Sequence, residues 1–329
     1  MEDHTTDEEK FHSDNSIKSN FFQYYKNNSK TSNLTLQQRR ETFLNAHKEK
    51  HSSAFDERRD LSELFEEYDC TSDETEGELM EVEKSPRRKK IRFRVSMSEW
   101  FTQIPDDLSD KWLVKFCPVG KRRLIISNMG KTKCFNKFGQ KLFHFISSLP
   151  GGSRKYTKKG GLSVLDCIFN EKTNTFFILD MLVWNSVSFL DCEAELRHCW
   201  MRSRFLENPE EFTPYGKNSY TFKFLSEYPA DIETIRSEMW LYETKNEVIC
   251  DGLIFYHRES PYISGLNPLI TWLKPFMLPE VLNIDVPQEY DKKRPSNYIN
   301  LKSYLMNISE KRKRRSQMEL METEESPRN

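Results

Sequence analysis

The sequence lacks the residue spacings that hold a zinc ion. Its seven cysteines never form a Cys-x-x-Cys pair, and its seven histidines are scattered among them. Because structural zinc sites use four such ligands at short spacings, we expect no metal site. An odd number of cysteines without paired spacing is typical of reduced thiols, and therefore of a protein of the cytosol or nucleus.

Long apolar runs are missing as well. No stretch approaches the ~18–20 apolar residues that a membrane span needs. The first twenty residues are polar and acidic, unlike a signal peptide. We therefore expect a soluble protein. Its 50 Lys and Arg residues balance 51 Asp and Glu residues, so net charge neither favours nor excludes a nucleic-acid partner, and only the distribution of charge is informative.

Three common enzyme motifs are also absent. The sequence contains no Gly-x-Ser-x-Gly nucleophile elbow, no Gly-x-x-x-x-Gly-Lys phosphate loop and no Gly-x-Gly-x-x-Gly dinucleotide loop. The sequence therefore gives no support for a hydrolase with such an elbow, a P-loop NTPase or a dinucleotide-dependent enzyme. We expect no cofactor.

The N-terminal third is divided by its charge pattern. Residues 1–20 hold few apolar groups and are predicted to be disordered. Residues 21–68 are predicted to be a basic helical segment, since Thr35 and Gln38 form a capping box and no Gly or Pro follows as far as Phe65. Sparse apolar residues give this helix a poor stripe for packing on a core. Residues 69–94, acidic and then basic, are predicted to be a linker.

The central region is rich in aromatic and β-branched residues, in short runs separated by turn residues. The short connections favour antiparallel neighbours, so we predict an α+β domain over residues 95–288 with a twisted, mostly antiparallel sheet. Few helices are expected, at Cys192–Phe205, Asp231–Trp240 and Leu278–Ile284. Residues 289–329 are predicted to be a charged C-terminal tail.

Three segments resemble, in their order, the motifs of messenger-RNA guanylyltransferases and ligases. They are Cys117-Pro-Val-Gly-Lys-Arg122, Leu165-Asp-Cys-Ile168 with Phe177-Ile-Leu-Asp180, and Asp251-Gly-Leu-Ile-Phe255 followed by Thr271-Trp-Leu-Lys274. In those enzymes the lysine of a Lys-x-Asp-Gly motif attacks the nucleotide α-phosphate. Cys117 and Val119 stand in the lysine and aspartate positions here, and a phosphoramidate needs a nitrogen nucleophile. We therefore expect a nucleotidyltransferase-like fold without catalysis, with an active GTP-dependent guanylyltransferase as the alternative.

A closer resemblance is to the snurportins, adaptors that carry capped small nuclear ribonucleoproteins into the nucleus. The motifs that carry it are Ser98-Glu-Trp100, Cys117-Pro-Val-Gly-Lys-Arg122, Leu149-Pro-Gly-Gly152, Leu165-Asp-Cys-Ile168, Asp251-Gly-Leu-Ile-Phe-Tyr-His257 and Trp272-Leu-Lys-Pro275. The resemblance implies a pocket for the 2,2,7-trimethylguanosine cap. It implies that Trp272 stacks on the methylated base, that Trp100 lies against the cap region, and that Ser98, Arg122 and Lys137 contact base, ribose or phosphates.

The chemistry of the cap agrees with these roles. Methylation at N7 makes the base a cation, so an indole face adds a cation–π term to a stacking energy of ~1–3 kcal/mol. The residues alone leave a plainer interpretation open. A tryptophan in a strand-rich domain is more often a core residue, Arg122 and Lys137 near turns are by default solvated charges, and Ser98 is by default a surface hydroxyl.

The basic helix precedes the region that resembles the cap-binding domain, as the importin-β-binding segment does in that family. The expected contacts to the acidic receptor are Arg39, Arg40, Lys48, Lys50, Arg58 and Arg59. Alternatively, the helix lies on its own domain as a solvated element, or only the helix functions and the pocket is vestigial. The family also implies an export receptor for recycling and shuttling between cytoplasm and nucleus. The resemblance thus predicts a non-enzymatic import adaptor.

Overall fold

The computed structural model describes most of the chain, in residues 35–53, 64–70, 88–154, 161–216, 220–246 and 248–324. The segment predicted to be disordered, residues 1–20, and most of the predicted linker lie outside these ranges. None of the described helices is long and apolar enough to span a membrane.

The larger of the two main sheets has seven strands. Its neighbours run in the order β10-β9-β8-β5-β6-β7, and β11 adds to β9 in parallel, whereas the other pairs are antiparallel. The strands are β5 (Lys121–Asn128), β6 (Lys131–Asn136), β7 (Lys141–Phe145), β8 (Ser163–Asn170), β9 (Thr175–Trp184), β10 (Val187–Ser188) and β11 (Thr221–Phe224).

The second sheet has five strands in the order β12-β4-β13-β14-β3, and only its β14–β3 pair is parallel. The strands are β3 (Ser96–Trp100), β4 (Trp112–Pro118), β12 (Glu227–Pro229), β13 (Cys250–His257) and β14 (Gly265–Leu273). A shorter ribbon pairs β1 (Tyr68–Cys70) with β2 (Arg88–Lys90). The predicted α+β class with mostly antiparallel sheets is confirmed.

The two large sheets pack against each other through a buried cluster to which both contribute. Its members include Cys117, Ile254, Tyr256 and Ile270 from the five-stranded sheet and Ile168, Phe177 and Leu179 from the seven-stranded sheet. Strands β4 and β9 are buried along their whole length, so apolar residues occupy both of their faces, with Lys115 and Asp180 as buried charged exceptions.

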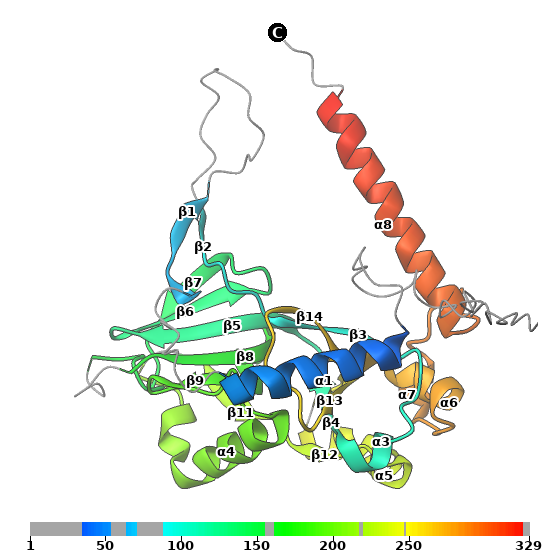
Figure 1. Ribbon diagram of the computed structural model, residues 1–329, viewed down its shortest axis with the longest axis horizontal. Coiled ribbons are helices and arrows are strands. Elements are labelled where there is room, and N and C mark those ends of the chain that lie inside the picture. Colours follow the sequence, from blue (N-terminus) through cyan, green and yellow to red (C-terminus); the bar gives the residue numbers. More distant parts are fainter. Residues whose placement is uncertain are drawn as a thin grey trace, which may run out of the picture.

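The helices lie at the periphery of the two sheets (Figure 1). They are α1 (Leu36–Ser53), α3 (Leu108–Lys111), α4 (Ala194–Glu207), α5 (Ile232–Asn246), α6 (Leu278–Val281), α7 (Gln288–Asp291) and α8 (Leu301–Glu324), with 3-10 turns η2 (Pro209–Phe212) and η3 (Pro275–Met277). The three helices predicted in the central domain correspond to α4, α5 and the shorter α6.

The predicted charged C-terminal tail, residues 289–329, contains the long helix α8. Helix α8 projects away from the rest of the molecule in Figure 1. Its first turns belong to the domain, because Leu301 and Leu305 are buried in the core and Ile308 packs against it. These positions follow an i, i+4, i+7 spacing, which places them on one helical face.

The capping box predicted at the start of α1 is confirmed. The Thr35 backbone N–H donates to Gln38 Oε1 at 2.9 Å, and the Gln38 backbone N–H donates to Thr35 Oγ1 at 3.2 Å. These reciprocal bonds satisfy two donors that a helix start otherwise leaves without partners. The predicted helix extends to Phe65, but residues 54–63 lie outside the described part of the chain.

Candidate functional site

Trp272 lies on β14 with its indole against the backbone of the neighbouring strand β13. A Cβ atom added at Gly252 would lie 2.1 Å from the Trp272 Cζ2 atom, so only glycine leaves room for the ring. The ring is half-buried, and the Lys274 ammonium lies 5.7 Å from the ring centroid. Lys274 is itself held by Asp251 Oδ1 at 2.7 Å. The indole is therefore held against Gly252, and the Lys274 ammonium lies near its ring.

Ser98 and Trp100 lie on β3, the parallel neighbour of β14. The strand register pairs Trp272 with Trp100, and the Phe101 backbone N–H donates to the Trp272 carbonyl at 3.0 Å. Trp100 is only 6% exposed, and its ring meets the edge of Tyr304 from α8 at 5.8 Å between centroids. Trp100 is thus a core residue beside the site, whereas Trp272 keeps part of its ring accessible.

Arg122 on β5 is fixed by a buried carboxylate. Its Nε and Nη2 atoms donate to the two oxygens of Asp166 at 2.5 and 2.6 Å. The Tyr262 hydroxyl donates to the same carboxylate at 2.5 Å and accepts the Ser96 backbone N–H at 3.0 Å. This chain of bonds connects Arg122 in the seven-stranded sheet to β3. Burial alone lowers the pKa of Arg122, but the Asp166 charge holds it well above its ordinary value, so the guanidinium stays charged.

The remaining predicted cap residue, Lys137, lies in the turn between β6 and β7. Its Nζ atom is 5.0 Å from the centroid of the Phe138 ring. The structure therefore places Ser98, Trp100 and Trp272 on adjacent strands of the five-stranded sheet. Arg122 lies in the other sheet and is linked to β3 through Asp166 and Tyr262, and Lys137 lies in a turn of that other sheet. Asp166 and Gly252 stand in motifs that carry the family resemblance, but the sequence assigns them no role in the site, and Tyr262 stands in none of these motifs. Their importance depends on contacts between distant strands.

The position compared with the nucleophilic lysine is occupied by a buried thiol. Cys117 is fully buried, and burial raises its pKa to about 12. The nearby Lys115 was not singled out from the sequence, although it is the one charged residue in the run Trp112–Cys117. Its Nζ donates to the Leu179 carbonyl at 2.7 Å, and burial lowers its pKa to about 8. Lys115 is fully buried, with its amine bound to β9 of the other sheet.

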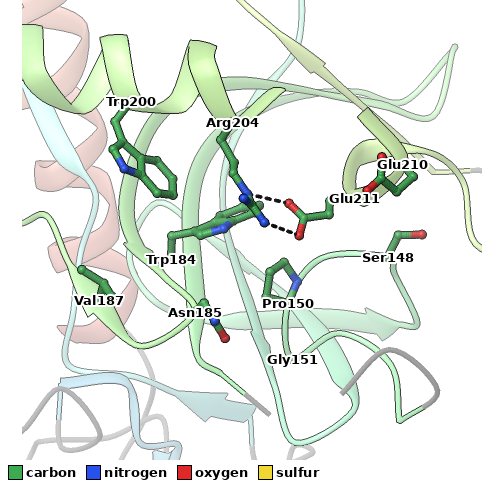
Figure 2. A pocket seen from close by; sticks show the side chains of 10 residues that line it. All are labelled: Ser148, Pro150, Gly151, Trp184, Asn185, Val187, Trp200, Arg204, Glu210 and Glu211. Atoms are coloured by element: carbon green, nitrogen blue, oxygen red, sulfur yellow. Dashed lines mark hydrogen bonds and ion pairs between the residues drawn. The ribbon is translucent and has the colours of Figure 1, made fainter. Parts of the chain in front are cut away.

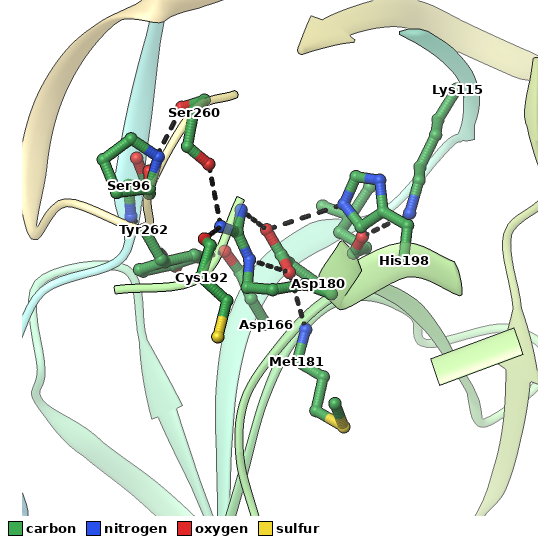
Figure 3. A network of polar contacts seen from close by, with 12 residues as sticks. Ser96, Lys115, Asp166, Asp180, Met181, Cys192, His198, Ser260 and Tyr262 are labelled. Atoms are coloured by element: carbon green, nitrogen blue, oxygen red, sulfur yellow. Dashed lines mark hydrogen bonds and ion pairs between the residues drawn. The ribbon is translucent and has the colours of Figure 1, made fainter. Parts of the chain in front are cut away.

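A buried polar network lies beside Lys115 (Figure 3). Arg197 donates to both oxygens of Asp180 at 2.9 and 2.7 Å and to the Ser260 carbonyl at 2.8 Å. The His198 Nε2 atom lies 3.6 Å from Asp180 Oδ2. Burial raises the pKa of Asp180, but the Arg197 charge outweighs it and holds the pKa well below its ordinary value. Asp180 thus belongs to a structural ion pair.

The buried His198 predicts a specific loss of stability in acid. Burial is the main cause that lowers its pKa from 6.5 to about 4. Between these values the unfolded chain binds a proton that the folded chain does not, so stability falls as pH falls, by at most about 1.4 kcal/mol per pH unit. Urea unfolding at pH 7, 6 and 5 should show a smaller decrease for His198→Gln than for wild type. Equal decreases would show that His198 does not titrate in this way.

A separate pocket of about 450 Å³ lies by the seven-stranded sheet and α4 (Figure 2). Trp184 and Trp200 line it with Arg204, whose guanidinium donates to both oxygens of Glu211 at 2.9 and 2.7 Å. None of the five predicted cap residues lines this pocket.

The basic helix α1 lies on the domain. Leu36 is fully buried and Arg39 and Arg40 are buried with it, whereas Lys48 is exposed. The prediction that α1 packs poorly on the core is wrong for its first turn, because polar contacts of the two arginines replace an apolar stripe. The side chain of Lys50, together with Arg58 and Arg59, lies outside the described part of the chain.

A family model of known proteins matches the part of the chain that contains this site. Residues 94–275 match a family model described as the Snurportin1 m3G cap-binding domain, which is more than half of the chain. The chain belongs to this snurportin family. The matched snurportin region begins just before β3 and ends at Pro275, so it contains all five predicted cap residues. Helices α1 and α8 lie outside it.

Similar solved structures are DNA ligases. The ligase domain of LigD from M. tuberculosis is 14% identical with a TM-score of 0.38, over 56% of this snurportin chain and 59% of that chain. The Chlorella virus DNA ligase-adenylate is 11% identical with a TM-score of 0.36, over 56% of this chain and 68% of that chain.

Proposed function

We propose that this protein is a non-enzymatic nuclear import adaptor. In this proposal it binds the 2,2,7-trimethylguanosine cap of small nuclear RNA and links the ribonucleoprotein to importin β. The observation that carries the first part is the half-buried indole of Trp272, seated on Gly252 within the region that matches the snurportin cap-binding family.

The cap would be recognised mainly by stacking and charge. A base methylated at N7 is cationic, and the partly exposed Trp272 ring offers it a π face. The two methyl groups on N2 remove both exocyclic donors, so selectivity rests on apolar fit rather than on hydrogen bonds. Arg122 and Lys137 would neutralise the triphosphate bridge. Ser98 and Trp100 would form the neighbouring edge of the site on β3.

The paired cap titration tests this proposal. Two additional buried methyl groups contribute about 0.8 kcal/mol each, so the trimethylated cap analogue should bind roughly tenfold more tightly than the 7-monomethylated analogue. Isothermal titration of the full chain with each analogue measures the ratio. Equal affinities would contradict the specificity part of the proposal.

Nucleotidyl transfer is the alternative function. The buried, protonated thiol of Cys117 argues against it, since the attacking group of such enzymes is an accessible amine. Incubation with labelled GTP and a divalent cation should leave no covalent label on the protein. A stable protein–GMP adduct would favour the enzyme instead.

The import half of the proposal depends on α1. Its basic side chains suit an acidic receptor surface, and Arg39, Arg40 and Lys48 are its described members among the six proposed contacts. Movement between cytoplasm and nucleus, and recycling by an export receptor, belong to the same proposal. Their support is the family match together with the basic character of α1.

A further inference from the structure

The first turn of α1 is held by a buried ion pair with the domain. Arg39 Nη1 and Nη2 donate to the two oxygens of Glu99 at 2.6 and 2.9 Å. The Glu99 side chain is fully buried and Arg39 is only 7% exposed, so the pair is largely removed from solvent. Bidentate pairing of this kind is stronger and more directional than a single contact with a lysine.

Arg40 makes a second, independent contact with the domain. Its Nε donates to the Pro268 carbonyl at 3.3 Å, and its guanidinium carbon lies 4.8 Å from the centroid of the Trp112 ring. Arg40 is 3% exposed and Trp112 is fully buried. Two consecutive arginines therefore enter the domain side by side, with Leu36 buried one turn before them.

Further along α1 the contacts have a different character. Lys48 pairs with Glu259 at 3.0 Å, but the Lys48 side chain is largely exposed, and such surface pairs contribute little. The docking of α1 is therefore concentrated in its first turn. Removing Arg39 from the domain leaves the fully buried Glu99 carboxylate without this charge partner, which is costly in a protein interior.

We propose that the surface formed by Glu99, Trp112 and Pro268 is an intramolecular docking site for the first turn of α1, and that it competes with the import receptor for Arg39 and Arg40. The competition rests on the proposed function, but the docking site does not. Neither guanidinium can occupy the domain and an acidic receptor groove at the same time. The receptor therefore binds only molecules in which α1 has left the domain, and its apparent affinity is reduced by that fraction.

Within β3, Glu99 lies between the predicted cap residues Ser98 and Trp100. Side chains alternate along a strand, so Glu99 points away from the face that carries Ser98 and Trp100. Trp100 shares a buried cluster with Trp112 of the docking site, so the two regions are adjacent in the fold.

Four full-length proteins test the proposal: wild type, Glu99→Gln, Glu99→Asp and the matched control Glu259→Gln. Glu99→Gln removes the buried carboxylate charge, whereas Glu259→Gln removes an exposed charge that pairs with the same helix. Hydrogen exchange of the α1 amides should be slow in wild type and in the control, and at least about tenfold faster in Glu99→Gln. Importin β should bind Glu99→Gln about tenfold more tightly than wild type, and the control within about twofold of wild type. Glu99→Asp, which keeps the charge on a shorter side chain, should fall between Glu99→Gln and wild type in both measurements.

Each result has a distinct meaning. If the α1 amides of wild type exchange as fast as those of an unfolded peptide, the docking site is overturned, and this measurement needs no variant. If α1 is protected in wild type but importin β binds wild type and Glu99→Gln equally, the competition is overturned. If importin β binds none of the proteins, the proposed link to the receptor fails, and hydrogen exchange still decides whether α1 docks.

Discussion

Replacing Trp272 with alanine is expected to weaken binding of the trimethylated cap analogue and to remove the preference over the monomethylated analogue. The indole lies on Gly252 and keeps part of its ring accessible, so its loss removes the stacking surface. A stacking contribution of ~1–3 kcal/mol corresponds to a loss of roughly 5- to 150-fold in affinity. Calorimetric titration of both analogues against the full chain measures both effects.

Two further variants test whether the effect belongs to the Trp272 ring in its position on Gly252. Trp240 on α5 is 55% exposed, so Trp240→Ala removes an accessible indole elsewhere and should leave cap binding unchanged. Gly252→Ala keeps Trp272 but places a methyl group where the ring lies, and it should reduce affinity by displacing the indole. Undiminished selectivity in Trp272→Ala would show that the cap is recognised elsewhere.

Replacing Arg197 with methionine is expected to destabilise the protein by about 3–5 kcal/mol, which is the cost of leaving one member of a buried ion pair alone. Arg197 and Asp180 are both fully buried and share two hydrogen bonds. The substitution keeps much of the side-chain volume, so the loss reports mainly on charge. The free energy of unfolding from urea denaturation is the measurement.

The exposed pair of Arg236 and Glu233 on α5 provides the matched control. Arg236→Met removes a solvated i, i+3 contact and should change stability by less than about 0.5 kcal/mol. The double variant Arg197→Met with Asp180→Leu should recover much of the loss, because no buried charge remains without a partner. A loss below about 1 kcal/mol in Arg197→Met alone would contradict the importance of this pair.

Features set by neighbouring residues were predictable from the sequence. The capping box of Thr35 and Gln38 involves residues three apart, and the observed bonds are the predicted ones. The short strands and their turns were also predictable, because strand and turn preferences depend on β-branched and Gly residues close together in the sequence. The resemblance to snurportins also came from short motifs, and the family match covers nearly the same residues.

Other features depended on pairing between distant segments. The parallel pairing of β14 with β3 joins strands far apart in the chain, and no local pattern specifies it. The interpretation of Arg122 as a solvated charge is wrong, because Asp166 lies 44 residues further along and pairs with it in the fold. The charged tail predicted over residues 289–329 contains a helix whose first turns complete the core around Tyr304 and Trp100.

The sequence by itself determined the class of fold, the start of the basic helix and the family, because capping, side-chain periodicity and motifs act over a few residues. Only the tertiary structure decided which charges are buried. Arg39 and Glu99 are 60 residues apart, and whether an arginine is solvated or enclosed depends on what the chain brings against it. The physical reason is that burial and charge pairing arise from the packing of the whole chain, whereas the sequence records each side chain only with its neighbours.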